Sequence, residues 1–334
     1  MSKVRVAFVG SGGMAEPHAA AVSKIKGAEI VGFCDLKPEL AQAKASQYGG
    51  KSFTDPAEML DTVKPTALYV LLPPFAHGVE LAAVARGIPF FVEKPIGLDM
   101  ALTKKIAAAV KRKKLITCAG YMNRYRKSVQ TVRNLLQSDP AIMLHGGWIG
   151  GTPNPDAAPI VRWWINKAKS GGQFLEQVTH TVDLTRFFCG NAVEVHAFAA
   201  KGHNKRVHPD YSIEDASVVN IRFASGAIAN LWASCSSNAG GGISLNVYAK
   251  NAAALFTGWD HSVKITRAGK EAVEIKGEPD IFDIEDAIFI KAVAAGDPSR
   301  IQSTYQDAAN SLAISVAANQ SMKSGKPVRV ERVG

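Results

Sequence analysis

The sequence predicts an α/β protein of two domains: a doubly wound parallel sheet, then an α+β domain with a mostly antiparallel sheet. Three observations lead to this prediction. The chain has 334 residues, more than one hydrophobic core usually supports. Strand-like and helix-like stretches alternate up to residue 120, as right-handed βαβ crossovers require. Beyond it, strand-like stretches follow one another with few helices between them. We therefore expect domains at residues 1–120 and 121–334.

The first domain opens with an apolar run at residues 4–9, which suits a buried central strand of a parallel sheet. Further strands are expected at 29–34, 67–72, 88–92 and 115–119. The helices between them have recognisable ends. Pro38 suits the first position of a helix, and Asp55 and Asp99 suit helix N-caps. Gly49 follows a helix and suits its end.

The second domain is expected to hold one long helix, from about residue 172 to 188. Strand-like stretches follow at 193–200, 216–223, 228–234 and 243–250. Ser225-Gly226, between two of these strands, is typical of a tight hairpin turn. An alanine-rich helix is predicted at 305–323, and a short final strand follows Pro327.

Composition excludes several classes of protein. Hydrophobic residues make up 47% of the chain and charged residues 20%, close to the average of globular domains. No stretch reaches the roughly 18 apolar residues of a membrane span, and the N-terminus lacks a secretory signal, so we expect a cytoplasmic protein. The net charge is +10, but the basic cluster 111–114 suits a helix C-terminus, and no nucleic-acid motif accompanies it. The four scattered cysteines favour buried reduced thiols over disulfides or a metal site.

A glycine-rich turn follows the first strand and opens the first helix. Gly10 permits the tight turn, Gly12 lets a pyrophosphate approach the backbone, and Ala15 allows close packing of helix on strand. Asp35 ends the second strand 20 residues after Ala15, where a carboxylate accepts hydrogen bonds from ribose hydroxyls. The pattern predicts a Rossmann domain that binds NAD. NADP stays open as a cofactor because Lys37 is able to bind a phosphate.

Two later strand ends are expected at the same edge of the sheet, since the carboxyl ends of parallel strands meet there. His77 follows the third long strand, where it either contacts the cofactor or has a structural role at a helix start. Lys94 ends the next strand, between Glu93 and Pro95, and a surface salt bridge is the default interpretation of this tripeptide. The residues expected at the cofactor are Gly10, Gly12, Gly13, Met14, Ala15, Asp35, Leu36, Lys37, Pro73, Pro74, His77, Glu93 and Lys94.

Glu176, His180 and Asp183 are spaced by four and then three residues, which places them on one face of the expected long helix. A solvated stripe is the simplest interpretation of this spacing. A shared metal ion is a second, but the sequence offers no obvious third ligand and no H-E-x-x-H pattern. Taken together with the glycine turn and Lys94, an acid and a histidine on this helix are compatible with a hydride-transfer site.

Together these motifs resemble those of the Gfo/Idh/MocA oxidoreductases, the family of glucose-fructose oxidoreductase and inositol dehydrogenase. The likeness covers nearly the whole chain. Its most specific part is the tripeptide around Lys94 followed by the helix with Glu176 and His180. Other similar segments are residues 123–125, 162–164 and 324–328.

The resemblance implies a C-terminal α/β domain whose large open sheet forms the interface of a homodimer or homotetramer. It also implies that the late helix, 305–323, packs back on the Rossmann domain, and that the bond before Pro95 is cis. Sugars, sugar derivatives or cyclitols are the implied substrates. His180 would exchange the hydroxyl proton and Lys94 would stabilise the same oxygen.

The resemblance also implies roles for four further residues. Asp183 is expected to hold a second substrate hydroxyl, and Arg124 and Trp163 to shape the site. Many family members carry Asp where this chain has Glu176. Three roles therefore stay open for Glu176: contact with the substrate, orientation of His180, or support of neighbouring site residues.

We therefore expect an NAD(P)-dependent dehydrogenase or reductase that acts on CH–OH groups of a small molecule, with no nucleic-acid or membrane partner. Two alternatives stay open: a member that uses NAD for redox-neutral processing of glycosides, and an NAD-binding regulator without catalysis. Retention of Lys94 and His180 argues against the regulator, because a sensor needs no paired proton-transfer site.

Overall fold

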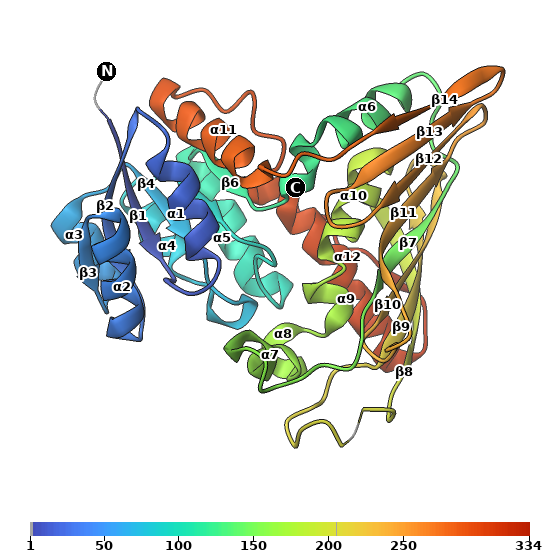
Figure 1. The fold of residues 1–334 in the computed structure, drawn as a ribbon, viewed down its shortest axis with the longest axis horizontal. Coiled ribbons are helices and arrows are strands. Elements are labelled where there is room, and N and C mark those ends of the chain that lie inside the picture. The colour runs from blue at the N-terminus through green and yellow to red at the C-terminus, as the bar shows by residue number, and fades with distance from the viewer. Residues whose placement is uncertain (1–2, 205) are drawn as a thin grey trace. The chain divides into compact units, whose positions relative to one another are not determined.

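The structure is a computed structural model that describes residues 3–204 and 206–334 (Figure 1). It divides into two compact units, each made of two chain segments. The first unit comprises residues 1–122 and 280–309, and the second comprises residues 123–279 and 310–334. The expected division at residue 120 does not separate the segment 280–309, which belongs with the N-terminal unit by its contacts.

The first unit is built on a parallel sheet in the order β3-β2-β1-β4-β5-β6, the order of a Rossmann fold. Its strands are β1 (Val4–Val9), β2 (Ala28–Cys34), β3 (Lys51–Phe53), β4 (Ala67–Val70), β5 (Phe90–Val92) and β6 (Thr117–Ala119). Its helices are α1 (Ala15–Ser23), α2 (Pro38–Tyr48), α3 (Pro56–Val63), η1 (Pro74–Ala76), α4 (Glu80–Ala85), α5 (Met100–Lys113) and α11 (Ile281–Ala295). The predicted doubly wound sheet is confirmed.

The helix ends of this unit follow the predicted chemistry. Asp55 and Asp99 cap α3 and α5, each accepting hydrogen bonds from two backbone N–H groups of the first turn. Pro38 is the first residue of α2, and Gly49 follows its last. The three-residue β3 and helix α11 were not predicted. β3 is too short to show a period, and strands β7 to β14 lie in sequence between α11 and the earlier helices of its unit.

The second unit is built on a sheet in the order β14-β13-β12-β11-β7-β10-β9-β8-β15. Its strands are β7 (Met143–Ile149), β8 (Ala192–Ala200), β9 (Ala216–Phe223), β10 (Ile228–Ser234), β11 (Gly242–Tyr248), β12 (Ala252–Thr257), β13 (Ser262–Arg267), β14 (Lys270–Ile275) and β15 (Val328–Arg329). All neighbouring pairs are antiparallel except β7 with β10. The predicted mostly antiparallel sheet is confirmed, as is the hairpin at Ser225-Gly226 between β9 and β10.

Helices lie before β7 and between β7 and β8, and one face of the sheet carries the core of the unit. The helices are η2 (Met122–Tyr125), which begins at the unit boundary, α6 (Lys127–Leu135), α7 (Pro159–Trp164), α8 (Lys167–Ser170), α9 (Gln173–Glu176) and α10 (Thr179–Cys189). The alanine-rich helix α12 (Tyr305–Ser324) begins in the first unit and belongs to the second from Asn310. Along β9 and β10, buried and more exposed residues alternate, and the buried ones, such as Val219 and Leu231, pack in one cluster with α10 and α12.

The expected single helix over 172–188 is wrong in one respect: the structure has two helices there. α9 ends at Glu176 and α10 begins at Thr179. At the break, the N–H groups of Gln177 and Val178 both donate to the carbonyl of Gln173, so the second bond spans five residues instead of four. The widened turn means that Glu176 and His180 do not lie on one continuous helix.

Candidate functional site

The glycine turn has the geometry that a dinucleotide phosphate needs. Gly10 has φ +90°, and a Cβ there would lie 2.3 Å from the carbonyl oxygen of Leu71, so only glycine fits. Around Gly12 and Gly13, by contrast, a Cβ would meet nothing within 4 Å, and both residues are exposed. Ala15, at the start of α1, is fully buried. The turn therefore leaves open backbone at a helix N-terminus, where an anionic phosphate is stabilised.

Asp35 joins the end of β2 to this turn. Its Oδ2 accepts a hydrogen bond of 2.8 Å from the Ser11 N–H, and its Oδ1 accepts one of 2.9 Å from the Lys37 N–H. The carboxylate is half-buried, while Leu36 and Lys37 are exposed beside it. The structure therefore brings together the glycine turn and the acidic strand end that the sequence predicted for NAD. These residues fit the cofactor: the turn would hold the pyrophosphate and Asp35 the ribose hydroxyls.

Lys94 follows β5 directly and is half-buried between two buried neighbours, Glu93 and Pro95. The Lys94–Pro95 bond is cis, as the resemblance implied. The Glu93 side chain bonds to the adjacent backbone: its Oε2 accepts a 2.9 Å hydrogen bond from the Lys94 N–H. The Glu93 carboxylate therefore holds the backbone of Lys94.

His77 lies near the same tripeptide. Its Nε2 is 3.0 Å from the carbonyl oxygen of Pro95, and its Nδ1 is 2.5 Å from Oε1 of Glu80. The side chain is only 1% exposed. Of the two roles considered for His77, this geometry favours the structural one. Pro73 and Pro74 precede it, with Pro74 buried at the start of η1.

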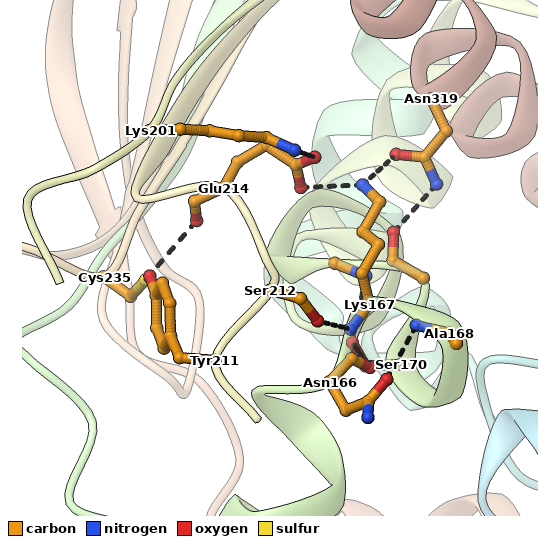
Figure 2. A network of polar contacts seen from close by, with 12 residues as sticks. Asn166, Lys167, Ala168, Ser170, Lys201, Tyr211, Ser212, Glu214, Cys235 and Asn319 are labelled. Atoms are coloured by element: carbon orange, nitrogen blue, oxygen red, sulfur yellow. Dashed lines mark hydrogen bonds and ion pairs between the residues drawn. The ribbon is translucent and has the colours of Figure 1, made fainter. Parts of the chain in front are cut away.

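The turn before α9 is held by a half-buried lysine in the second unit (Figure 2). Lys167 Nζ is 2.7 Å from Glu214 Oε2 and donates a second 2.7 Å hydrogen bond to Oδ1 of Asn319. Asn319 in turn donates through Nδ2 to the carbonyl of Gly171. Gly172 follows with φ +91°, and a Cβ there would lie 2.7 Å from both Lys167 Nζ and Glu214 Oε2. This network fixes the start of the helix that carries Glu176.

Glu176 and His180 are each 8% exposed. The imidazole of His180 meets the indole of Trp259 edge to face, with ring centroids 6.1 Å apart. Trp259 lies between β12 and β13, and His261 Nδ1 is 3.0 Å from its carbonyl oxygen. Trp259 is itself half-exposed, so it forms a wall beside the histidine. Sequence reasoning missed it, because a tryptophan between two unpredicted strands carries no spacing signal.

The Asp183 carboxylate accepts hydrogen bonds from other residues of the second unit. Arg124 donates two hydrogen bonds to its carboxylate, of 2.7 and 2.5 Å, and Ser311 donates a third of 2.6 Å. Asp183 is 1% exposed and Arg124 2%. The structure thus brings together two residues that were expected at the substrate, but as a buried ion pair. This geometry favours a bracing role for both.

A cavity of about 230 Å³ in the second unit contains Glu176 in its wall. Its apolar part includes Trp148 and Trp164, and its polar part includes the amides of Gln173 and Gln177. The remaining lining residues are Gly150, Gly151, Pro153, Ile160, Val161 and Cys235. Trp163 is partly buried and packs on the neighbouring apolar cluster rather than lining the cavity. A carboxylate, amides and two indole rings around one cavity suit a ligand with polar and apolar parts.

In the described part of the chain, no three histidine, cysteine, aspartate or glutamate side chains gather as a metal site would require. None of the helices in residues 3–204 and 206–334 has the length and apolar character needed to cross a membrane. All four cysteines are buried as thiols rather than joined in disulfides, as predicted.

Comparisons with known proteins agree with this geometry. Residues 4–121 match a model of an oxidoreductase family with an NAD-binding Rossmann fold, and residues 143–254 match the GFO/IDH/MocA C-terminal domain. The NAD-dependent scyllo-inositol 2-dehydrogenase of Bacillus subtilis (strain 168) is 25% identical over 98% of this chain and 97% of its own length.

Two solved structures share the fold at lower identity. A myo-inositol 2-dehydrogenase from Lactobacillus plantarum superposes with a TM-score of 0.83 at 23% identity, over 99% of this chain and 100% of its own. A levoglucosan dehydrogenase in complex with NADH superposes with a TM-score of 0.87 at 18% identity, over the same shares. Because the two family models together span most of the chain, the protein belongs to the Gfo/Idh/MocA family of oxidoreductases and has an NAD-binding Rossmann domain.

Proposed function

We propose that the protein is an NAD-dependent dehydrogenase or reductase that acts on a CH–OH carbon of a sugar, sugar derivative or cyclitol. The cavity beside Glu176 is the observation that supports this substrate class most. Its volume of about 230 Å³ is below the roughly 300–1,000 Å³ of pockets for drug-sized ligands, which suits a single small ring. Tryptophan faces match the C–H face of such a ring, and the carboxylate and amides match its hydroxyls.

His180 is proposed as the group that exchanges a proton with the substrate hydroxyl. Imidazole titrates near neutral pH, so it accepts the proton when the alcohol is oxidised and returns it in reduction. Lys94 is proposed to hydrogen-bond the same oxygen and to stabilise its developing negative charge. When bound, NAD supplies the nicotinamide carbon that accepts or donates the hydride. Gly10, Gly12 and Asp35 are proposed to hold it.

Glu176, Asp183 and Arg124 are proposed to support the reaction at His180 and Lys94 in different ways. Because Glu176 lines the cavity, we assign it to a substrate hydroxyl. Because Asp183 and Arg124 are buried against each other, we assign them to bracing α10, on which His180 stands. Trp163 is assigned to packing behind the cavity wall.

We also propose that the protein works in the cytoplasm as a homodimer or homotetramer, formed through the open face of the second sheet. On this face, Phe198, Val218 and Trp232 form one row across β8, β9 and β10. Phe198 and Val218 are exposed, as are Ile228 and Met143 in another row on the same face. Such a row of exposed apolar residues suits an isologous contact with a second copy.

The test measures the formation of reduced nicotinamide through its near-ultraviolet absorbance. The protein is given NAD or NADP together with a panel of sugars, sugar acids and inositols. We expect turnover with NAD and at least one ring polyol. Bond cleavage in a glycoside without net reduced nicotinamide would identify the redox-neutral alternative instead. Tight NAD binding with silence on alcohols, glycosides and the matching ketones would contradict the proposal and favour a regulator.

A further inference from the structure

Two histidines in the first unit lie on either side of Lys94, and each is paired with a buried carboxylate. His18, on α1, is fully buried, and the His77 side chain is 1% exposed. Neither pairing was visible in the sequence. The two pairs bury four ionisable side chains near one lysine, and each buried charge costs free energy of desolvation.

The first pair is His18 with Asp286, which joins α1 to α11. His18 Nδ1 lies 3.0 Å from both carboxylate oxygens of Asp286, and its Nε2 lies 3.1 Å from Oε1 of Glu93. Burial alone would lower the pKa of His18, but the two carboxylates raise it to about 10. His18 is therefore an imidazolium at neutral pH and donates through both nitrogens.

Glu93 links the His18–Asp286 pair to Lys94 through two hydrogen bonds. Its Oε1 faces His18 and its Oε2 accepts the Lys94 N–H at 2.9 Å. The space for the carboxylate comes from Gly120, where a Cβ would lie 2.6 Å from Oε1. A chain of hydrogen bonds thus runs from Asp286 through His18 and Glu93 to the backbone of Lys94.

The second pair is His77 with Glu80, on the other side of Lys94. His77 Nε2 donates a 3.0 Å hydrogen bond to the carbonyl of Pro95. Its Nδ1 lies 2.5 Å from Glu80 Oε1, and Glu80 Oε2 accepts the Gly78 N–H at 2.7 Å. Glu80 is fully buried. The backbone is therefore held at the N–H of Lys94 by one pair and at the carbonyl of the next residue by the other.

We propose, on the basis of the function proposed above, that His18–Asp286 and His77–Glu80 position Lys94 by holding the backbone at the Lys94 N–H and at the carbonyl of Pro95. A lysine side chain is long and has many rotamers, so the place of its ammonium depends on a fixed backbone. In a preorganised site, a displacement of about 1 Å costs about 100-fold in rate. Both histidines are positioning residues, since neither needs to contact the substrate.

The test uses substitutions that keep one nitrogen of the histidine at a time. In His18→Gln the amide nitrogen reaches the position of Nε2 and still donates to Glu93, whereas in His18→Asn it reaches the position of Nδ1 and serves only Asp286. Phe289→Leu is the stability control, because Phe289 packs on Tyr69 and Phe91 in the same core without a polar contact. The same pair of substitutions at His77 tests the second dyad.

Three quantities are measured for each variant: kcat and KM of the intact enzyme, the Kd for NAD, and hydrogen exchange of the peptide around Lys94 in NAD-free protein. We expect His18→Asn to lower kcat by about 10- to 100-fold and to speed that exchange, with the Kd for NAD within about threefold. His18→Gln should keep most of kcat, and Phe289→Leu should lower the melting temperature alone.

Equal losses in the Asn and Gln variants, or losses that follow the melting temperature as in Phe289→Leu, would overturn the proposal. If the unaltered protein turns over no substrate, the proposed function fails and kcat is uninformative. The exchange measurement then decides the positioning proposal by itself, because unchanged exchange in both Asn variants would refute it.

Discussion

At the scale of single residues, Asp35 has two tasks that the structure separates. Its carboxylate oxygens hold the N–H groups of Ser11 and Lys37, and its negative charge lies beside the open glycine turn. We expect the charge to disfavour a 2′-phosphate, while the hydrogen bonds shape the turn. The two tasks predict different effects of removing the side chain and of neutralising it.

We predict that Asp35→Ala lowers the ratio of kcat/KM for NAD over NADP by about 10-fold or more, since a repulsion worth about 1.4 kcal/mol is tenfold. Asp35→Asn should lower the ratio similarly with a smaller loss of NAD affinity, because an amide oxygen still accepts a hydrogen bond. Asp61→Ala, which removes an exposed acid of the same unit, serves as the control. A ratio unchanged in both Asp35 variants would refute the ribose assignment.

His180→Ala should lower kcat by about 100-fold or more, because the variant has no group to exchange the hydroxyl proton. The Kd for NAD should change little, since the residues proposed to hold the cofactor are in the other unit. His203→Ala, at an exposed histidine, should keep full activity. Unimpaired turnover in His180→Ala would remove this residue from the mechanism.

The sequence predicted residues whose signal is local and missed those whose partners are remote. Gly10 and Asp35 follow strands at a recognisable spacing, so their meeting was predictable. The contact of His18 with Asp286 joins residues 268 positions apart, and no periodicity reports such a pair. Asp183 was visible by spacing, but its burial against Arg124 depends on tertiary packing.

At the scale of elements, the break between α9 and α10 shows what helical spacing leaves out. Glu176 and His180 are four residues apart, so a period of 3.6 residues fits them. The carbonyl of Gln173 instead accepts from both Gln177 and Val178, and the first helix stops there. A one-residue shift in hydrogen bonding leaves the sequence pattern intact, and only the backbone reveals it.

We predict that Gly172→Ala unfolds at lower denaturant and loses activity, while Gly190→Ala loses stability alone. Both glycines have positive φ with an extended ψ, a region that costs other residues about 1–3 kcal/mol. Only at Gly172 would the added Cβ also strike Lys167 and Glu214, so its loss of unfolding free energy should be larger by at least about 1 kcal/mol. Equal losses in the two variants, measured in urea, would contradict this.

The pairing of α1 with α11 gives stability a dependence on pH. The pKa of His18 is raised to about 10, above its unfolded value of about 6.5, so its stabilisation is complete below about pH 6.5 and is lost as the pH rises toward 10. We predict that the unfolding free energy of the native protein exceeds that of His18→Gln, and that this difference shrinks by about 1 kcal/mol or more across that range. Groups titrating equally in both proteins cancel, so a constant difference would refute the pairing.

At the scale of the whole molecule, the class of each unit was predictable and the path of the chain was not. Alternating strands and helices predicted the parallel sheet, and Ser225-Gly226 predicted an antiparallel pair. Within the returning segment 280–309, helix α11 was not foreseen. β14 is exposed along nearly its whole length, so it lacks the apolar alternation that marks a half-buried strand.

The open face of the second sheet leads to a prediction about assembly. If it forms an isologous contact, Phe198→Asp places a carboxylate in the interface of both copies, and the dissociation constant should rise by about 100-fold or more. Val273→Asp is the matched control, because Val273 is also exposed but pairs with buried Ile265 and so lies on the opposite face. Light scattering after gel filtration should show a lower mass for Phe198→Asp alone. The same mass for both variants and the native protein would assign assembly, if any, to another surface, since an unpaired buried charge is not tolerated in a dimer interface.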